Sequence, residues 1–519
     1  MTVPATPHFV TVASGQLRLW SAGEGAPVVV LPGLVRAASV VANQLAAVAP
    51  DRAFRVFELP GIGGSADVPC ESLAQIVDAV RGAIESAGLG GAPILAFDLA
   101  APIAAQLRGT REFVNLAPAR AWAWRGLATP DLTPRPDGTH LNALFAHLRD
   151  AQTLDAQTGR CAAREGDPLP TPDELDAMMV TAGIRPQAYA ALWSICCAAT
   201  RTLDAEGAAT LDAALAVMRG AARCPAGALP RPTPTDSIWR DYVDTPRGRI
   251  HLRLSGPERR PVIALHSAPG SAAPLRPLLA DLGTARRVIA PDFLGNGDSA
   301  KPDARVDIAT LARDAVAVAD AIGLPTFDLW GTHTGALIAL EVAIQAPDRV
   351  GRVILEAPPL LEPAFTADLL ANYFPELRPD GWGLYLQQAW NMRRDMFLFW
   401  PWYRAERTAA RPLAIPDAAF LHDWTIGLLT SGATYHRTYR AAFEYDTRAR
   451  LPLLRRPALL CAGPADMLAD GLAAAGDLIA GEAMVAPTPA TVWYPGQGEA
   501  AVRQTMAAYE RFLETGGVG

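Results

Sequence analysis

The sequence lacks the features that would direct it to a membrane or to nucleic acid. No uninterrupted apolar stretch is long enough to span a bilayer, and the first residues, MTVPATPHFVTV, show no signal-peptide pattern. There is no basic run with interleaved aromatic residues, and the formal net charge is −7. This charge argues against nucleic acid or an anionic membrane as the main partner. We therefore expect a soluble, cytoplasmic protein.

Paired cysteines are missing as well. The six cysteines form no C-x-x-C pair and no metal-ligand spacing: Cys70, Cys161, Cys196, Cys197, Cys224 and Cys461. We interpret them as reduced thiols, and we expect neither a metal nor another cofactor. The composition itself is globular, with 50% hydrophobic and 19% charged residues. A chain of 519 residues is too long for one ordinary core, which predicts two domains.

An internal repeat organises the chain. Four segments of the first half align with four of the second, at offsets between 233 and 235 residues: FVTVASGQLRLWSAG with YVDTPRGRIHLRLSG, PVVVLPG with PVIALHS, ELPGIGGSA with DFLGNGDSA, and ILAFDLA with LWGTHTG. A nearly constant offset over four segments is hard to obtain by chance, and we interpret it as an ancient duplication.

Each copy alternates strands and helices, which predicts a mostly parallel sheet covered on both faces. The strands FVNLAP and VILEAP follow in the two copies, and the second copy is expected to end with a strand at 490–496. The first copy continues only in helices, over 126–223, and is therefore predicted to be truncated. The Pro-rich stretch 224–237 is the predicted linker.

Five motifs in order carry a resemblance to a known family. They are His266-Ser267-Ala268-Pro269-Gly270, Asp292-Phe293-Leu294-Gly295-Asn296-Gly297-Asp298-Ser299, Gly331-Thr332-His333-Thr334-Gly335, Gly463-Pro464-Ala465-Asp466 and Pro495-Gly496-Gln497-Gly498-Glu499. Residues 238–519 resemble a complete member of the α/β-hydrolase superfamily, closest in pattern to epoxide hydrolases, haloalkane dehalogenases and C–C-bond hydrolases. Residues 1–125 resemble a degenerate N-terminal half of the same fold. The expected fold class is therefore α/β, with two tandem α/β-hydrolase-like units and a helical lid at about 359–448 in the second.

The resemblance implies a catalytic site in which two of three positions are substituted. His333 stands where the superfamily keeps its nucleophile, and Glu499 stands in the position of the base, while Asp466 keeps the acid position. We predict that His333 is a general base, held by Glu499 and possibly by Asp466. The expected activity is a hydrolase or lyase reaction by acid–base chemistry, and not that of an ordinary serine hydrolase.

Backbone groups would complete this site. The N–H of Thr334, with that of Ser267 or Ala268, is expected to form an oxyanion hole. His266, at the start of the flanking loop, is a candidate contact to substrate. The elbow of the first copy carries Asp98, where the resemblance to haloalkane dehalogenases and epoxide hydrolases implies an aspartate nucleophile. Ala96 and Ala100 replace the flanking glycines, which favours a buried or helix-capping carboxylate in a noncatalytic half.

Several alternatives stay open at this stage. His333 could be a structural residue of an inactive relic that binds a ligand or partner protein, and Glu499 could be a solvated loop carboxylate. Asp466 could cap the next helix. His333, Asp466 and Glu499 could also form a one-histidine, two-carboxylate metal site, although no local pattern indicates one.

The predicted lid is rich in aromatic residues, which indicates a small hydrophobic organic substrate. Trp390, Trp400 and Trp402 are the candidate substrate contacts, although such residues could equally attach the lid to the rest of the protein. Arg393, Arg394 and Arg404 look like ordinary solvated residues, although any of them that faced inward could hold a carboxylate. The truncated half is expected to pack against the second as an intramolecular pseudo-dimer, and a homo-oligomer is possible.

Overall fold

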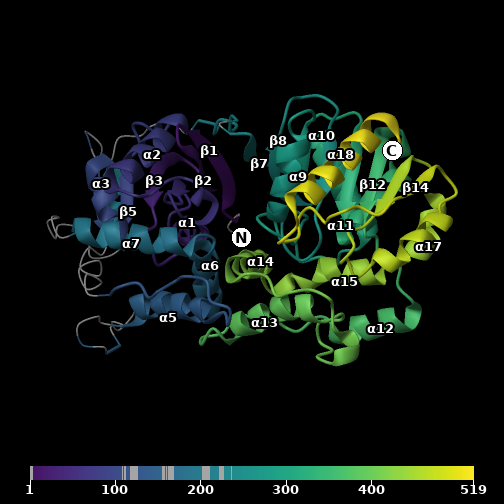
Figure 1. The fold of residues 1–519 in the computed structure, drawn as a ribbon. Coiled ribbons are helices and arrows are strands. Elements are labelled where there is room, and N and C mark those ends of the chain that lie inside the picture. The colour runs from purple at the N-terminus through teal and green to yellow at the C-terminus, as the bar shows by residue number, and fades with distance from the viewer. Residues whose placement is uncertain are drawn as a thin grey trace. The chain divides into compact units, whose positions relative to one another are not determined.

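A computed structural model of the chain shows two compact units (Figure 1). One unit consists of Met1–Asp236 with Pro379–Gln387, and the other of Ser237–Arg378 with Gln388–Gly519. No helix among the residues that the structure describes is both long and apolar enough to cross a membrane. The described residues are 4–107, 109, 113–116, 127–154, 158, 160–161, 169–200, 211–220, 227–234 and 236–518.

The second unit is built on an eight-stranded sheet with the order β14-β13-β12-β11-β9-β10-β8-β7. Its strands are β7 (Ile238–Thr245), β8 (Gly248–Ser255), β9 (Val262–Leu265), β10 (Val288–Pro291), β11 (Phe327–Thr332), β12 (Val350–Glu356), β13 (Ala458–Cys461) and β14 (Ala483–Val485). Only β8 runs against the other strands, since it is antiparallel to both of its neighbours, β7 and β10. Because the central strands are apolar on both faces, helices must cover both sides of the sheet.

Helices supply that cover in two layers. Helices α9 (Arg276–Leu282) and α18 (Glu499–Thr515) pack on one face, and α10 (Ile308–Ala321), α11 (Thr334–Gln345) and α17 (Leu472–Asp477) pack on the other. The strand β11 runs directly into α11, which lies against the middle of the sheet (Figure 1). This strand-to-helix turn therefore stands at the carboxyl ends of the parallel strands, where ligands bind in open α/β sheets.

A helical insertion separates β12 from β13, where the sequence predicts a lid. It contains α12 (Pro363–Asn372), α13 (Leu384–Leu398), α14 (Ala418–Thr430), α15 (His436–Glu444) and α16 (Thr447–Arg450). One short piece of this insertion, Pro379–Gln387, belongs to the first unit. There the Tyr385 hydroxyl donates to the Asp176 carboxylate, with 2.6 Å between the oxygens. The sequence gives no signal for this exchange of a segment.

The first unit has a six-stranded sheet with the order β1-β2-β4-β3-β5-β6. Its strands are β1 (Thr6–Val12), β2 (Gly15–Ala22), β3 (Ala26–Leu31), β4 (Arg52–Phe57), β5 (Ile94–Phe97) and β6 (Phe113–Leu116). This order repeats the positions of β7 to β12 in the second sheet, as the offset in the sequence predicts. The two units are therefore tandem α/β units, the first with fewer strands in its described part.

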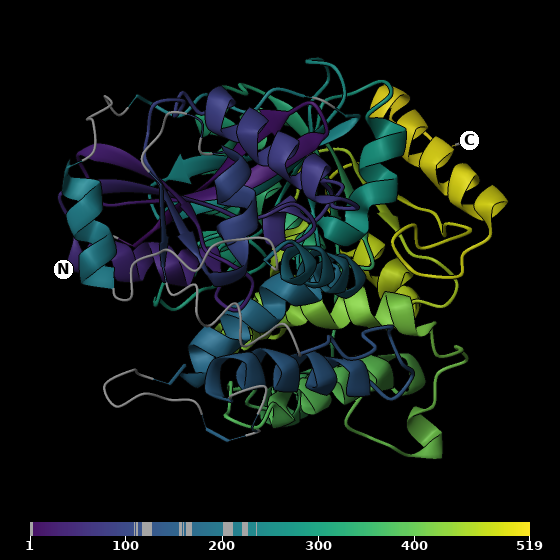
Figure 2. The same cartoon turned by 90° about the vertical axis from the view of Figure 1, so that its left-hand side faces the viewer.

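Helices fill the rest of the first unit, which Figure 2 shows from the front. They are α1 (Ala38–Val48), α2 (Leu73–Ser86), α3 (Ala101–Leu107), α5 (Thr139–Thr153), α6 (Pro172–Gly183), α7 (Pro186–Thr200) and α8 (Leu211–Gly220). Leu215 and Met218 of α8 share a core with Val114 and Leu116 of β6. Part of the predicted linker, including Cys224, lies outside the described residues.

The prediction of a strand at 490–496, at the end of the second unit, is wrong. Residues 491–496 form turns, and the edge strand β14 lies earlier, at Ala483–Val485. The Trp493 indole N–H donates to a buried carboxylate of Glu356, with 2.8 Å between nitrogen and oxygen. This contact fixes the segment as a loop over the carboxyl end of the sheet, so that its alternating apolar residues do not pair with an edge.

Candidate functional site

The turn between β11 and α11 places His333 at the carboxyl edge of the sheet. Its backbone has φ 50° and ψ −113°, a conformation in the positive-φ region that few residues other than glycine adopt. Two glycines make this turn possible. A Cβ on Gly331 would lie 2.2 Å from the Gly335 carbonyl oxygen, and one on Gly335 would lie 2.0 Å from that of Leu265. The tight turn thus presents the His333 side chain above the sheet.

The imidazole of His333 meets the carboxylate of Asp466. His333 Nε2 lies 2.8 Å from Asp466 Oδ2, while the other oxygen, Oδ1, accepts a hydrogen bond from the Leu468 N–H at 2.9 Å. Asp466 therefore orders the turn after β13 and orients the imidazole at the same time. The second ring nitrogen, Nδ1, has no hydrogen-bond partner in the described part of the chain. It is the nitrogen left to act on a ligand.

The two groups change each other's pKa. Burial lowers the pKa of the His333 imidazole, but the charge and hydrogen bond of Asp466, together with the charge of Glu356, outweigh burial, and the pKa is raised above its ordinary value. Burial raises the pKa of Asp466, but His333 outweighs that effect and holds the pKa below its ordinary value. Asp466 thus remains a carboxylate and makes the imidazole a stronger base.

A second carboxyl group, Glu356, lies at the end of β12 next to the elbow. Its backbone carbonyl accepts from the His333 N–H, with 3.0 Å between nitrogen and oxygen. The side chain is fully buried and accepts from the Trp493 indole and the Tyr509 hydroxyl, both at 2.8 Å. Burial raises the pKa of Glu356 despite these donors. Sequence reasoning missed this residue, although an acid at the end of a buried strand, in VILEAP, was a signal for it.

The expected contact between His333 and Glu499 is wrong. Glu499 is the first residue of α18, its side chain is 92% exposed, and its carboxylate pairs with Arg503 one turn later. The helix begins at this residue, so the side chain projects into solvent, whereas that of His333 is only 17% exposed. The hypothetical metal site of His333, Asp466 and Glu499 is therefore not assembled.

The backbone donors predicted for the oxyanion hole surround a cavity. Thr334, Ser267 and Ala268 all line it together with His333. Within the described residues, the N–H groups of these three residues donate to no protein acceptor. They are thus available for an oxygen of a ligand, as the geometry of an oxyanion hole requires.

His266 has a structural role instead of the predicted contact with substrate. Its ring is buried, stacks on Phe293, and accepts from the Phe293 N–H at Nε2, 3.3 Å away. Its Nδ1 lies 2.6 Å from the Ser267 carbonyl oxygen. Because Nδ1 donates and Nε2 accepts, the ring is neutral, and burial lowers its pKa further. His266 fixes the loop that carries the backbone donors.

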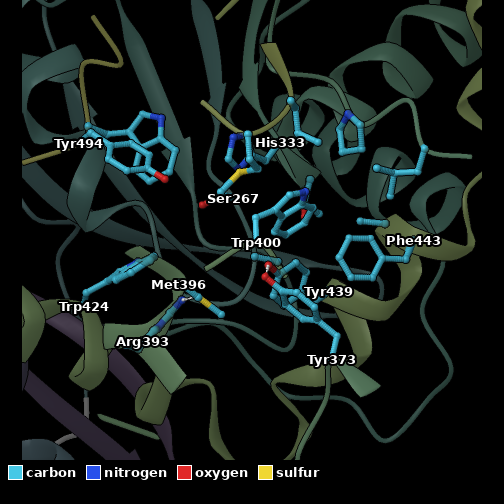
Figure 3. Close-up of a pocket in the computed structure, with 18 of the residues that line it drawn as sticks. Ser267, His333, Tyr373, Arg393, Met396, Trp400, Trp424, Tyr439, Phe443 and Tyr494 are labelled. Carbon is cyan, nitrogen blue, oxygen red and sulfur yellow. Dashed lines mark hydrogen bonds between the residues drawn. The ribbon is translucent and has the colours of Figure 1, made fainter. Parts of the chain in front are cut away.

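Lid residues close the cavity opposite the elbow. Figure 3 shows His333 and Ser267 on one side and Arg393, Met396 and Tyr439 on the other. The cavity has a volume of about 60 Å³, several times the roughly 10–15 Å³ that one water needs. Its apolar lining includes Trp400, Trp424, Phe443 and Trp493.

Of the tryptophans predicted to contact substrate, only Trp400 lines this cavity. Trp390 is fully buried within the protein. The Trp402 indole donates to the Tyr373 carbonyl oxygen at 3.3 Å, and its ring packs edge-on against Tyr373. Both residues stabilise the lid, which was the alternative reading of the aromatic cluster.

The interpretation of Arg393 as a solvated residue is also wrong. Its side chain is buried, with the whole residue 2% exposed, and it lines the cavity together with Arg411. The sequence around it, NMRRDM, contains charged neighbours that hide the buried one. By contrast, Arg404 pairs with Asp368 and Arg394 with Asp395 at partly exposed positions.

Comparison with known proteins gives matches to a family, to curated relatives and to solved structures. Residues 260–391 match the family described as alpha/beta hydrolase fold. A 2-hydroxymuconate semialdehyde hydrolase of Pseudomonas putida is 35% identical over 155 residues, which cover 29% of this chain and 51% of that protein. A haloalkane dehalogenase of Mycolicibacterium paratuberculosis is 33% identical over 117 residues, 22% of this chain and 38% of that protein.

The chain thus spans about half the length, or less, of the curated relatives that it matches. Among solved structures, Epoxide Hydrolase A from Mycobacterium thermoresistibile is 24% identical and aligns with a TM-score of 0.42. That alignment covers 54% of this chain and 98% of the other.

Proposed function

Because the second unit belongs to the α/β-hydrolase superfamily, we propose that it is a hydrolase or lyase that uses His333 as its general base. The substrate is a small hydrophobic ester or carbonyl compound. In this proposal Asp466 takes the orienting role that the sequence assigned first to Glu499. The site does not work as an ordinary serine hydrolase, since its elbow carries an imidazole in place of a hydroxyl.

The observation that carries the proposal is the 2.8 Å contact between His333 Nε2 and Asp466 Oδ2. A carboxylate in this place fixes the tautomer with the proton on Nε2 and stabilises the imidazolium that forms during reaction. Nδ1 is then the unprotonated nitrogen. A positioned base of this kind contributes about 10²- to 10⁴-fold to a rate.

For hydrolysis, Nδ1 takes a proton from water while the water oxygen attacks the substrate carbonyl carbon. The carbonyl oxygen becomes an oxyanion and accepts hydrogen bonds from the N–H groups of Thr334 and Ala268. When the tetrahedral intermediate collapses, the leaving group departs and receives the proton from the imidazolium. The same base would remove a carbon-bound proton in a lyase reaction.

Chemical rescue tests this proposal directly. Glycine fits the positive φ at position 333, so His333→Gly keeps the backbone and leaves a space the size of the imidazole. We expect hydrolysis of a panel of aryl esters to fall at least 100-fold in this variant and to recover, in a saturable manner, when free imidazole is added. Unchanged turnover in His333→Gly would contradict the proposal and leave a ligand-binding relic as the better account.

A serine-directed fluorophosphonate supplies a second test on the unmodified protein. We expect no labelled residue on the elbow peptide 327–345 by mass spectrometry. Labelling of Ser267, the serine in the cavity lining, would show that an ordinary serine nucleophile works here after all.

A further inference from the structure

Two guanidinium groups line the cavity without a carboxylate partner. The Arg393 side chain donates to the Pro269 carbonyl oxygen at 2.8 Å and approaches the Met396 sulfur at 3.8 Å. Arg411 donates to the carbonyl oxygens of Met396 and Ala465 at 2.5 and 3.1 Å. In the part of the chain that the structure describes, neither arginine forms a salt bridge.

Arg393 also has an unused donor. Its Nε is buried and has no hydrogen-bond partner in the described structure. The guanidinium lies against the Trp424 ring, 4.4 Å from the ring centre, which holds it in place but does not neutralise it. Burial lowers the pKa of Arg393 to about 10, so the group is still a cation at neutral pH. A buried cation with an unused N–H is unfavourable unless an anion satisfies it.

The acids near the cavity do not provide that anion. Asp466 is committed to His333 and to the Leu468 N–H. The Glu356 carboxyl group is committed to the Trp493 indole and the Tyr509 hydroxyl, from which it accepts hydrogen bonds. The charge of Arg411 helps to hold the pKa of Asp466 low, but no described carboxylate forms a salt bridge with Arg411 or Arg393. Both guanidinium groups therefore line the cavity without a bonded acid.

We propose that the ligand of this cavity is a small organic carboxylate with an apolar or aromatic body. The carboxylate pairs with Arg393 and Arg411, and the apolar body lies among Trp400, Trp424 and Phe443, towards His333 (Figure 3). The planar fork of a guanidinium matches a carboxylate. The apolar lining selects against a fully polar anion such as inorganic phosphate. This inference deepens the proposed function by giving the substrate a negative charge.

Equilibrium binding tests the inference without turnover. Phenylacetate and its neutral isostere phenylacetamide are titrated into the full chain, and tryptophan fluorescence is recorded, because three tryptophans line the cavity. We expect phenylacetate to bind at least tenfold more tightly, as a charge-assisted hydrogen bond predicts. Equal binding of the acid and the amide would overturn the inference, as would equal binding of inorganic phosphate.

Variants assign the selectivity to residues. Arg393→Gln is expected to remove the preference for the acid, and Arg411→Gln to reduce it. Arg394→Gln, the next residue on α13, is the matched control and should leave it unchanged. If Arg393→Gln does not fold, as judged by circular dichroism, Arg411→Gln decides in its place. Retained selectivity in the folded arginine variants would contradict the assignment.

The same assay separates this inference from the proposed function. His333→Gly should still prefer phenylacetate over phenylacetamide, because the arginines remain. Selective binding without imidazole-dependent turnover would leave the ligand class standing and remove the general base. Turnover that depends on His333 without a preference for the acid would leave the general base standing and remove the ligand class.

Discussion

The two units share a strand order but differ in what the elbow side chain does. In both, the residue directly after the fifth strand of the unit has a positive φ: 39° at Asp98, after β5, and 50° at His333, after β11. The backbone device that presents a side chain above the sheet is thus present twice. In the second unit this side chain lines a cavity.

In the first unit the elbow side chain turns back on its own helix. Asp98 Oδ1 accepts from the Leu99 N–H, with 2.6 Å between oxygen and nitrogen. Leu99 corresponds to Thr334, whose N–H is available in the second unit. The Asp98 carboxylate also occupies the space over Gly33, where an added Cβ would lie 2.0 Å from Oδ1. The place of a ligand oxygen is therefore filled by the protein itself.

The sheets also end differently. The second continues from β12 to β13, and the turn after β13 carries Asp466. The described part of the first sheet ends at β6, where α8 packs. The described part of the first unit therefore has no strand in the position that carries the orienting carboxylate. An elbow alone therefore does not make a site. The site also needs the neighbouring strands that position the orienting carboxylate.

Substitution of asparagine at the two elbows should lower the rate of ester hydrolysis in one case and leave it unchanged in the other. Asparagine tolerates positive φ, so His333→Asn and Asp98→Asn both preserve the turn. We expect His333→Asn to lower the rate of ester hydrolysis by about 10²- to 10⁴-fold, and Asp98→Asn to leave it within twofold. Steady-state kinetics on the two full-length variants measures the difference. A comparable loss in Asp98→Asn would break the contrast between the units.

Each unit also has a buried pair of side chains, one on the second strand and one directly after the fourth strand of that unit. In the first unit Arg18 and Glu58 form a salt bridge of 2.9 Å. The corresponding pair in the second is His251 and Asp292, also at 2.9 Å. In both units a serine then ties the turn, since Ser65 Oγ donates to the Glu58 carbonyl and Ser299 Oγ to that of Asp292.

Removing the acid should cost more stability in the first unit. Glu58→Gln leaves a buried arginine that cannot lose its proton, and we expect a loss of about 3 kcal/mol in unfolding free energy. Asp292→Asn keeps a side-chain oxygen beside His251 that can still accept a hydrogen bond, at a cost of about 1 kcal/mol. Hydrogen exchange measured by mass spectrometry reports β2 and β4 separately from β8 and β10. Equal losses would show that the two pairs are energetically equivalent.

The cluster of His251, Asp292 and Asp298 also has the composition of a metal site. Asp292, however, accepts from the N–H groups of Ala272 and Asp298 in addition to facing His251. In the first unit Arg18 stands at the position that corresponds to His251. The pair therefore stabilises the turn in both units.

Asp466→Asn tests the contribution of the turn after β13, a strand without a counterpart in the described part of the first sheet. We expect the maximal rate to fall about 100-fold, because an amide no longer fixes the tautomer of His333. The acid limb of the pH–rate profile should move to lower pH. Asp466 is the largest cause that raises the pKa of His333, and burial lowers that pKa, so we expect the pKa to fall once the carboxylate is gone. An unmoved acid limb would show that another group controls the rate.

The smallest effect is expected at Glu499. Its carboxylate is exposed and contacts only Arg503, so Glu499→Gln should change turnover by less than twofold and stability by less than about 0.5 kcal/mol. Steady-state kinetics and thermal unfolding measure both. A tenfold loss of turnover would return Glu499 to the site.

The sequence predicted the fold better than the site. The repeat and the alternation of strands and helices are local patterns, and the glycines beside His333 are dictated by close backbone contacts, so both could be read without coordinates. The partner of His333 depends on where α18 begins and which loop passes over the sheet. Arg393 is hidden because a helix buries one of two adjacent arginines, which only packing decides. Glu356 is an acid within a strand, and its role depends on Trp493 and Tyr509 from distant segments.

The pKa of the His333 imidazole tests the central claim most directly. The chain has eight histidines, so the signal of His333 in the ¹⁵N-histidine NMR spectrum is assigned by its loss in His333→Asn. In the unaltered protein we predict a pKa above the ordinary histidine value, and in Asp466→Asn a pKa below it. The same pKa in both proteins would contradict the claim that Asp466 holds His333 as the base.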